Sequence, residues 1–252
     1  MTGNAAGEGI PETAERRYDA VLLDMGYTLV HFEPKQEVIL QHALQAIDVE
    51  RSLDEIWAAT DATYADETRD AATATFPATP EYDRESQRRF DRNLLAHMGL
   101  AADPSTMDAF AAALRSEYGR PGVLRPYPEV LDVLAALRER GYRLGIVSNW
   151  SWNLRQRAAQ VDLDRFFEVI WSSAYAGCNK PHPAIFHQTL AQMQPALPPN
   201  RVLYVGDSYW HDVVGARGAG MDAALLDRHG KANSPDCPVI RDLWGILDLL
   251  GE

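Results

Sequence analysis

The sequence predicts an α/β fold: a parallel five-stranded core sheet with helices on both faces, plus an inserted all-helical cap domain. Two observations support this prediction. From residue 127 onward, short apolar runs alternate with helix-like segments, which is the pattern of a parallel sheet with right-handed crossovers. Before that, residues 34–122 show only helical periodicity, and this stretch is too long to be a simple crossover between two strands.

The first expected strand is the apolar run Ala20–Leu23. Four consecutive apolar residues between turn-like segments indicate a strand that is buried on both faces. Asp24 follows directly, and Gly26 comes two residues later. In open α/β sheets the ligand crevice lies at the carboxyl ends of the strands. Asp24 is therefore the first candidate functional residue, although a lone aspartate there can also simply cap a turn.

Residues 34–122 are expected to form a helical cap. Apolar residues recur at helical spacing in four windows, which are 38–47, 53–60, 90–98 and 107–114. Trp57 lies on the apolar stripe of the second window, so we expect it in a core. Ser52 is a candidate helix N-cap, and Asp103-Pro104 opens the last helix. The segment 71–82 contains two prolines and is expected to be irregular.

After the cap, the remaining strands and helices alternate and give a Rossmann-like core that occupies 18–33 and 123–252. The expected strands are 142–147, 166–171, 202–205 and 223–226. The expected helices are 128–141, 153–160, 183–193, 212–219 and 240–250. Glycines at 141 and 220 mark the ends of two of these helices.

The later strands bring further polar groups to the same sheet edge as Asp24. Ser148 ends one strand, Asp207 ends another, and Lys180 lies in a loop after a third. Two carboxylates form an oxygen-rich site that suits Mg²⁺. A hydroxyl and an ammonium group can bind the oxygens of a phosphoryl group, and a carboxylate is a competent nucleophile towards phosphorus. This set of groups predicts phosphoryl transfer, in which stabilising charge is the main task.

From Asp24 to its end, the chain resembles the haloacid dehalogenase superfamily of hydrolases. Four motifs of that family occur here in the family's order. The first family motif, D-x-D-G-T, corresponds to Asp24-Met25-Gly26-Tyr27-Thr28, and the second, a strand ending in Ser or Thr, to Ile146-Val147-Ser148-Asn149. The third, a Lys commonly followed by Pro, corresponds to Lys180-Pro181. The fourth, G-D-S and a second acid, corresponds to Gly206-Asp207-Ser208 with Asp212. The helical insertion is similar to the cap that covers the site in this family.

The resemblance implies a role for each matched residue. Asp24 would be the nucleophile, Lys180 would restrain it, and Thr28 would shape its loop. The implied ligands of Mg²⁺ are Asp24, the backbone carbonyl of Gly26, Asp207 and Asp212. The implied phosphoryl-binding residues are Ser148, Asn149 and Lys180. Simpler roles remain open at this stage: Ser148, Asn149 and Asp212 are also good helix caps, and Lys180 can be a surface lysine.

The chain departs from the family's phosphatases at Gly26. Those enzymes have an acid at this position, which protonates the leaving oxygen and later activates water; glycine can do neither. General acid–base catalysis contributes roughly 10²–10⁴ in rate. We therefore expect a slow phosphatase, one restricted to good leaving groups, or one with a substitute acid. His31, Tyr27 and His211 are the nearby candidates for a substitute, although packing roles are favoured for each.

The favoured function is Mg²⁺-dependent hydrolysis of a small phosphorylated metabolite through an aspartyl phosphate on Asp24. One alternative is a 2-haloacid dehalogenase, because the dehalogenating members of the family also lack the second acid and have Tyr in its place. They generally lack the G-D-S pattern, however. Another alternative is a catalytically impaired protein that binds a phosphorylated ligand and has a regulatory role.

Composition excludes some other functions. The net charge of −12 argues against nucleic-acid and membrane-surface binding, which need basic patches. Residues 1–17 are polar, lack the hydrophobic stretch of a signal peptide and are expected to be a disordered tail. The two cysteines have no metal-ligand spacing and fit a reducing compartment, so we expect a cytoplasmic protein. We also expect a monomer or a homodimer. Arg84, Arg88 and Arg89 are expected on a solvated helix face paired with acids.

Overall fold

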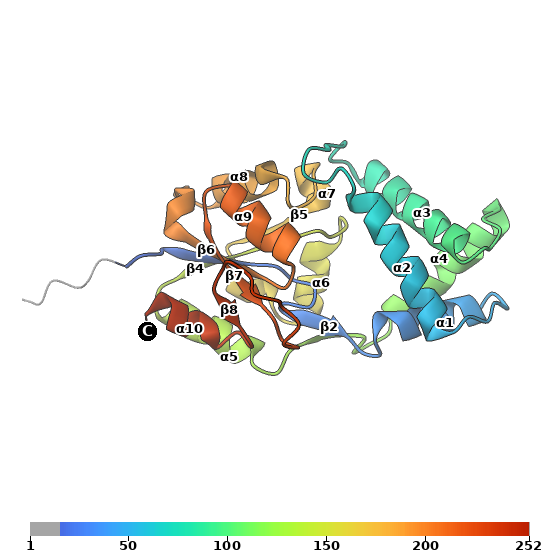
Figure 1. Ribbon diagram of the computed structural model, residues 1–252, viewed down its shortest axis with the longest axis horizontal. Coiled ribbons are helices and arrows are strands. Elements are labelled where there is room, and N and C mark those ends of the chain that lie inside the picture. Colours follow the sequence, from blue (N-terminus) through green and yellow to red (C-terminus); the bar gives the residue numbers. More distant parts are fainter. Residues whose placement is uncertain (1–15, 252) are drawn as a thin grey trace, which may run out of the picture.

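The computed structural model describes residues 16–251 and has a parallel sheet with a separate group of helices beside it (Figure 1). The sheet has six strands in the order β5-β4-β1-β6-β7-β8, and every neighbouring pair is parallel. The strands are β1 (Ala20–Leu23), β4 (Arg143–Ser148), β5 (Val169–Ser172), β6 (Val202–Gly206), β7 (Asp222–Leu226) and β8 (Val239–Ile240). The predicted α/β class is confirmed.

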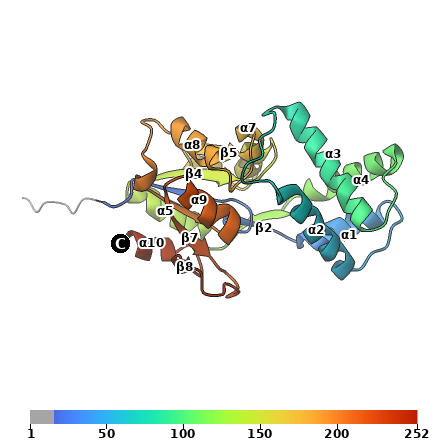
Figure 2. The same ribbon diagram turned by 45° about the horizontal axis from the view of Figure 1, so that its top comes forward.

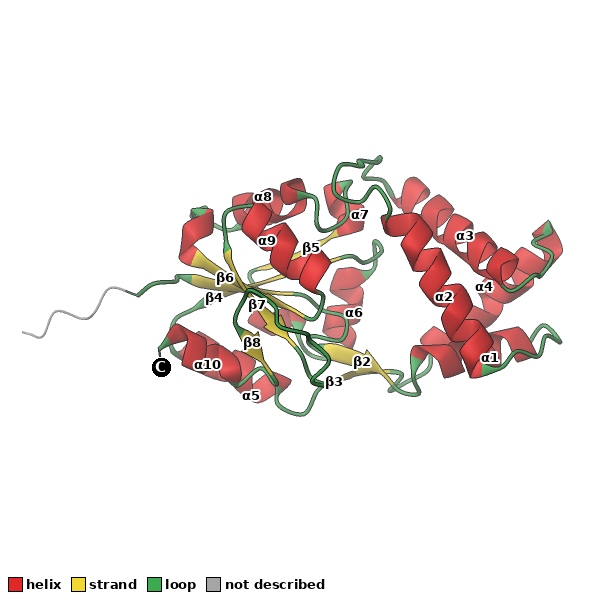
Figure 3. Cartoon of the chain, viewed as in Figure 1, coloured by secondary structure: helices red, strands yellow, loops and turns green. Residues whose placement is uncertain are grey.

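Helices cover both faces of this sheet, because the central strand β1 is apolar at every position and points side chains both ways. Val21 and Leu23 pack in one core with α5 (Val130–Glu139), α6 (Leu154–Gln160) and α10 (Gly245–Leu250). Ala20 and Leu22 pack in a second core with α8 (Pro183–Gln192) and α9 (Gly215–Gly218). The two helical layers flank the sheet in Figure 3. The short helices α7 (Ser173–Ala176), η1 (Asp164–Phe166) and η2 (Pro199–Arg201) lie in the connections.

The inserted helical cap is also confirmed, and Figure 2 shows it as a body of its own beside the sheet. Its helices are α1 (Gln36–Gln45), α2 (Leu53–Thr68), α3 (Pro80–His97) and α4 (Pro104–Tyr118). They enclose a separate core around Leu44, Ile56, Leu94 and Phe110. Ser52 begins α2 with a capping box, in which its hydroxyl and the Glu55 carboxylate each accept a bond from the other residue's backbone N–H. The boundaries 34 and 122 stay a prediction.

Three features of the fold differ from the sequence prediction. The sheet has a sixth strand, because Val239 and Ile240 pair with Leu225 and Leu226, so the last helix begins at Gly245 rather than at residue 240. A two-stranded antiparallel ribbon of β2 (Val30–Phe32) and β3 (Leu124–Pro126) joins the core to the cap. The helix expected at 212–219 begins earlier, as the π-helical turn η3 (Tyr209–Val214), and only Gly215–Gly218 is α-helical, as α9.

Individual side chains in the cap both correct and confirm the sequence analysis. The expectation of a core position for Trp57 is wrong, because 58% of its surface is exposed. The expectation that the three arginines of α3 pair with acids is confirmed, and Arg84 and Arg88 do so on an exposed surface, whereas the Arg89 pair is partly buried. The pairs are Arg84–Glu81 at 2.9 Å, Arg88–Asp108 at 2.8 Å and Arg89–Glu67 at 3.4 Å.

Most of the predicted N-terminal tail, residues 1–15, lies outside the described residues. Its last two residues contact the core: Arg17 pairs with Asp222 at 2.8 Å, and the Arg16 guanidinium packs on the Tyr142 ring. Among the helices of residues 16–251, none has the length and apolar character that a membrane crossing requires.

Candidate active site

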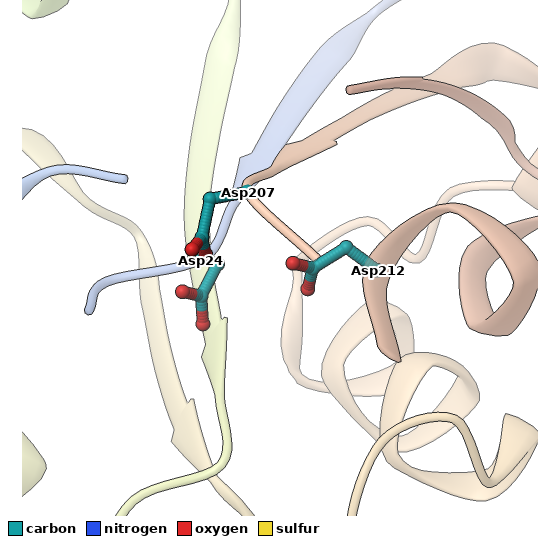
Figure 4. Close-up of side chains that lie close together, drawn as sticks. All are labelled: Asp24, Asp207 and Asp212. Carbon is teal, nitrogen blue, oxygen red and sulfur yellow. The ribbon is translucent and has the colours of Figure 1, made fainter. Parts of the chain in front are cut away.

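Three carboxylates converge at the carboxyl edge of the sheet (Figure 4). Asp24 follows β1, Asp207 follows the neighbouring strand β6, and Asp212 lies in the π-helical turn η3. One oxygen atom of each lies within 4.8 Å of the others. Gly206 makes this approach possible, because a Cβ atom at that position would overlap the Asp212 carboxyl group.

Lys180 is the positive charge at the centre of this group. Its Nζ donates to Asp24 Oδ1 and to Asp212 Oδ1, both at 2.6 Å, and to the Tyr204 hydroxyl at 3.1 Å. Only 3% of the side chain is exposed, so Lys180 is not a surface lysine. Burial works against the charged form, but the charges of Asp212 and Asp24 outweigh it and raise the pKa of Lys180. The lysine is therefore held charged between two acids.

The charges of the site do not balance, because Asp24, Asp207 and Asp212 surround a single ammonium group. Burial raises the pKa of Asp24, against the opposing effect of Lys180. The residue Asp207 is exposed overall, but its carboxyl group is largely desolvated by the surrounding protein atoms. This desolvation, together with the charges of Asp24 and Asp212, raises the pKa of Asp207 to about 7. A divalent cation among these oxygens would favour the ionised carboxylates. The donor set thus fits Mg²⁺, which takes hard oxygen ligands.

Ser148 is the last residue of β4, the other neighbour of β1, and Asn149 follows it. The Ser148 hydroxyl acts to lower the pKa of Asp24 and so favours its ionised form. The Asn149 amide bonds the Lys180 backbone at both ends: its Oδ1 accepts from the Lys180 N–H at 2.7 Å, and its Nδ2 donates to the Lys180 carbonyl at 3.1 Å. This side chain holds the Lys180 loop in place. Neither residue caps a helix, because the next helix begins at Leu154.

Asp212 is also not a helix cap in the structure. Its side chain is buried, one oxygen accepts from Lys180, and the other accepts from the Ser208 backbone N–H at 2.9 Å. Ser208 itself is the residue that begins the helical turn, and its side chain accepts from the His211 N–H. Asp212 is therefore a buried partner of Lys180 and not a helix cap.

A residue that the sequence analysis missed positions the loop that carries Asp24. Arg228, just beyond β7, donates from Nη2 to the Thr28 carbonyl at 2.8 Å and pairs through Nη1 with Glu129 at 2.7 Å. Its guanidinium lies 3.6 Å from the centre of the Tyr127 ring. The Thr28 hydroxyl in turn donates to Asp207 at 3.4 Å. The sequence feature that could have identified Arg228 is a charged residue just after a buried strand.

The three candidate substitutes for the missing acid each have another contact. The Tyr27 hydroxyl donates to Gln36 at 3.0 Å, and burial raises the pKa of Tyr27. The His31 ring packs against Tyr127 with their centres 4.7 Å apart. His211 Nδ1 lies 3.0 Å from the Ser208 hydroxyl, and burial lowers the pKa of His211. His31 Nδ1 and His211 Nε2 are nevertheless buried without a hydrogen-bond partner among the described residues, so these contacts leave the catalytic role of the three side chains a prediction.

Fold and site together define an α/β protein with a parallel sheet, an acidic centre at the carboxyl edge of that sheet and an inserted helical cap. The family model of haloacid dehalogenase-like hydrolases matches residues 18–220, so the chain belongs to this family. Among curated relatives, a glyceraldehyde 3-phosphate phosphatase of Methanopyrus kandleri is 33% identical over 152 residues, which are 60% of this chain and 63% of that protein. The haloacid dehalogenase-like hydrolase domain-containing protein 3 of Bos taurus is 32% identical over 132 residues, 52% of this chain and 51% of that protein.

Solved structures share the fold over nearly the whole chain. A putative HAD-hydrolase of Bacillus subtilis bound to magnesium has a TM-score of 0.73 and 19% identity, covering 94% of this chain and 100% of that one. The L-2-haloacid dehalogenase RSc1362 has a TM-score of 0.71 and 21% identity, covering 93% and 99%. At these identities the likeness concerns the fold alone. The chain also spans less than two thirds of the curated relatives cited above.

Proposed function

We propose that the protein is a Mg²⁺-dependent hydrolase of a small phosphomonoester that reacts through an aspartyl phosphate on Asp24. The observation that supports this most strongly is the pairing of Asp24 with Lys180 beside two further carboxylates, Asp207 and Asp212. A nucleophilic carboxylate, a fixed cation and an oxygen-rich metal site are what phosphoryl transfer requires.

In this proposal Asp24, Asp207 and Asp212 would hold Mg²⁺, with the Gly26 carbonyl as the expected backbone ligand. When bound, the ion would offset negative charge on the carboxylates and on the phosphoryl oxygens. Lys180 fixes one Asp24 oxygen by its 2.6 Å bond and leaves the other available for attack on phosphorus. Ser148 and Lys180 would bind phosphoryl oxygens, and Asn149 would act by holding the Lys180 backbone.

The names of the relatives suggest which substrates to try first. A glyceraldehyde 3-phosphate phosphatase makes a small phosphorylated metabolite a reasonable substrate class here, and such substrates suit the expected cytoplasmic location. The dehalogenase alternative shares the fold, but the three-carboxylate cluster favours the metal-dependent reaction. The missing acid at Gly26 still motivates the third alternative, a phosphate-binding regulatory protein.

The test is turnover of 4-nitrophenyl phosphate by the full chain with Mg²⁺ and with excess chelator. We expect chelator and Asp24→Asn each to lower turnover by at least about 10³-fold, because the nucleophile and the charge stabilisation are both essential. Asp132→Asn, an exposed acid on α5, is the matched control and should behave as wild type. Turnover that ignores chelator or survives Asp24→Asn rejects the proposal.

Two further measurements separate the alternatives. Chloride release from 2-chloropropionate without added metal would support the dehalogenase. Calorimetric binding of Mg²⁺ and inorganic phosphate, with no turnover across a panel of phosphate esters, would support the regulatory protein.

A further inference from the structure

Aromatic rings occupy the space beside the position where the second acid is missing. A Cβ atom built on Gly26 would lie 3.5 Å from Cζ3 of Trp150. Trp150 is two residues beyond the end of β4, Gly26 is three residues beyond the end of β1, and these strands are neighbours. The indole is fixed by its Nε1–H, which donates to Asn153 at 3.0 Å. The side chain next to the second position after the nucleophile is thus a ring and not an acid.

Trp150 belongs to a group of rings at the junction of core and cap, which we call the aromatic junction: Tyr27, Phe32, Tyr118 and Trp150. Phe32 stacks on Trp150 with centres 6.3 Å apart and contacts Tyr118 edge-on at 5.3 Å. Tyr27 meets Phe32 edge-on at 6.5 Å. The rings come from the Asp24 loop, the ribbon strand β2, the end of α4 and the loop after β4, so the junction joins the loop of the nucleophile to the cap.

Part of this junction is open to solvent on the side of the cap. Tyr27 is 45% exposed, and 48% of Tyr64, on α2 of the cap, is exposed as well. Burial raises the pKa of Tyr27, and the nearby Tyr64 phenol raises it further. Tyr27 belongs to the core and Tyr64 to the cap, so a half-exposed ring is present on each side of the cap–core boundary.

We propose that the substrate is an aryl phosphate, whose aromatic leaving group packs against the aromatic junction and departs without a proton from the enzyme. This inference rests on the proposed function and specifies its substrate class. A phenol has a pKa of about 10, well below that of an aliphatic alcohol, so phenolate leaves readily where an alkoxide needs a general acid. Aromatic side chains offer a ring favourable stacked or edge-on contacts. The absent acid and the rings beside Gly26 both fit this substrate.

The reaction is balanced without a further reagent. An Asp24 oxygen forms a bond to phosphorus while the bond from phosphorus to the aryl oxygen breaks, and that electron pair leaves with the phenolate, which takes a proton from water. Water then attacks the phosphorus atom of the aspartyl phosphate. Inorganic phosphate is released, and the Asp24 carboxylate forms again.

The experiment compares kcat/KM for three phosphates with the Mg²⁺-loaded full chain. Phenyl phosphate has a ring and a good leaving group, benzyl phosphate has a ring and an alkyl leaving group, and glyceraldehyde 3-phosphate has only the alkyl leaving group. We expect phenyl phosphate to exceed benzyl phosphate by roughly 10²-fold or more, and benzyl phosphate to exceed glyceraldehyde 3-phosphate by roughly 2- to 10-fold. If benzyl phosphate matches phenyl phosphate, or glyceraldehyde 3-phosphate matches benzyl phosphate, the inference is wrong.

Variants test the ring contact directly. Trp150→Leu should lower kcat/KM for phenyl phosphate by about 10-fold and that for acetyl phosphate, which has no ring, by much less; Trp150→Phe should restore most of the loss. Phe32→Leu serves the same purpose if Trp150→Leu does not fold. Trp244→Leu, at an exposed residue just before α10, is the control. Equal losses on both substrates overturn the inference. Its failure differs from that of the proposed function, because Asp24→Asn would still abolish every turnover.

Discussion

The lysine at the centre of the site shows why its residues must be considered together. Lys180 is buried with Asp24 and Asp212 at 2.6 Å each, and the loss of one partner from such a group leaves an uncompensated charge. Asn149 holds the lysine backbone, and Gly206 leaves room for Asp212. Asn149 thus positions the charge of Lys180, and Gly206 positions the charge of Asp212, beside Asp24. The effect of each residue therefore depends on the others.

Restoring the acid at Gly26 should change the kinetics of the enzyme. Without a base to activate water, the aspartyl phosphate should break down slowly, so 4-nitrophenyl phosphate should give a burst of about one nitrophenol per enzyme before the steady state. Gly26→Asp fits the backbone, because the nearest atom to its Cβ is 3.5 Å away. We expect this variant to lose the burst and to gain at least about 10-fold in kcat on benzyl phosphate. Rapid-quench kinetics measures both effects, and Gly26→Asn, which has no acid, is the control. A wild type without a burst, together with no gain in the variant, would mean that another group already acts.

Asp91 should make the stability of the protein depend on pH. It lies in α3, is 3% exposed, accepts a bond from Gln87 at 3.0 Å, and burial raises its pKa to about 6. The unfolded chain loses this proton near pH 4, so between about pH 4 and 6 the folded state binds more protons and stability falls as pH rises. At pH 7.5, Asp91→Asn should be more stable than wild type by about 1–3 kcal/mol.

Urea denaturation at a series of pH values measures this difference. The advantage of Asp91→Asn should be small near pH 4 and should vanish near pH 3, because Asp91 is then protonated in both the folded and the unfolded wild type. Asp61→Asn, an exposed acid on α2, should show no such dependence. An advantage that is the same at every pH would contradict the buried-acid explanation.

At the scale of elements, the sequence predicts best where hydrophobic pattern alone determines structure. The five longer strands are continuous apolar runs, and the groups after them, such as Asp24 and Asp207, converge because parallel strands end at one edge. The strand Val239–Ile240 is too short to show a period, so the sixth strand escaped prediction. Trp57 was misplaced because its apolar helix stripe divides in the structure: Ile56 is buried in the cap core, whereas Leu53 and Trp57 are exposed. Arg228 was missed because its contact with Thr28 joins residues that are 200 positions apart.

The connection between cap and core should depend on Gly177, at the end of α7. It has φ of +69°, its carbonyl accepts from the Phe76 N–H at 2.8 Å, and a Cβ there would lie 2.6 Å from the Phe76 carbonyl oxygen. Gly99 has φ of +71° but no atom within 4 Å of its Cβ position. Gly99→Ala should therefore cost about 1–2 kcal/mol from backbone strain alone. Gly177→Ala should cost at least about 1 kcal/mol more in urea denaturation; equal losses would show that the segment around Phe76 moves away freely.

At the scale of the whole molecule, the cap has an apolar core of its own and the sheet has two others. Ile39 of α1 packs in one core of the sheet, and the aromatic junction adds the contact of Phe32 with Tyr118. The other contacts between cap and sheet include the ribbon of β2 and β3, the Phe76–Gly177 backbone bond, and the bond from the Arg157 side chain to the Tyr118 carbonyl at 2.9 Å. Polar contacts of this kind permit domain motion more readily than a large apolar interface does. We therefore expect the cap to adjust to a substrate where these polar contacts lie, without disturbing the charged centre.

One further contact across this boundary gives a direct test of that motion. Asp83, on α3 of the cap, accepts from the backbone N–H of Trp152 at 3.0 Å. A hydrogen bond of this kind contributes about 0.5–1.5 kcal/mol, so Asp83→Ala should speed hydrogen exchange at the Trp152 amide by up to about 10-fold. It should also raise KM for phenyl phosphate with little effect on kcat, because the cap closes less firmly while Asp24 and Lys180 stay in place. Glu85→Ala, an exposed acid on the same helix, should leave both measurements unchanged. Unaltered exchange in Asp83→Ala would mean that the bond does not hold the cap against the core.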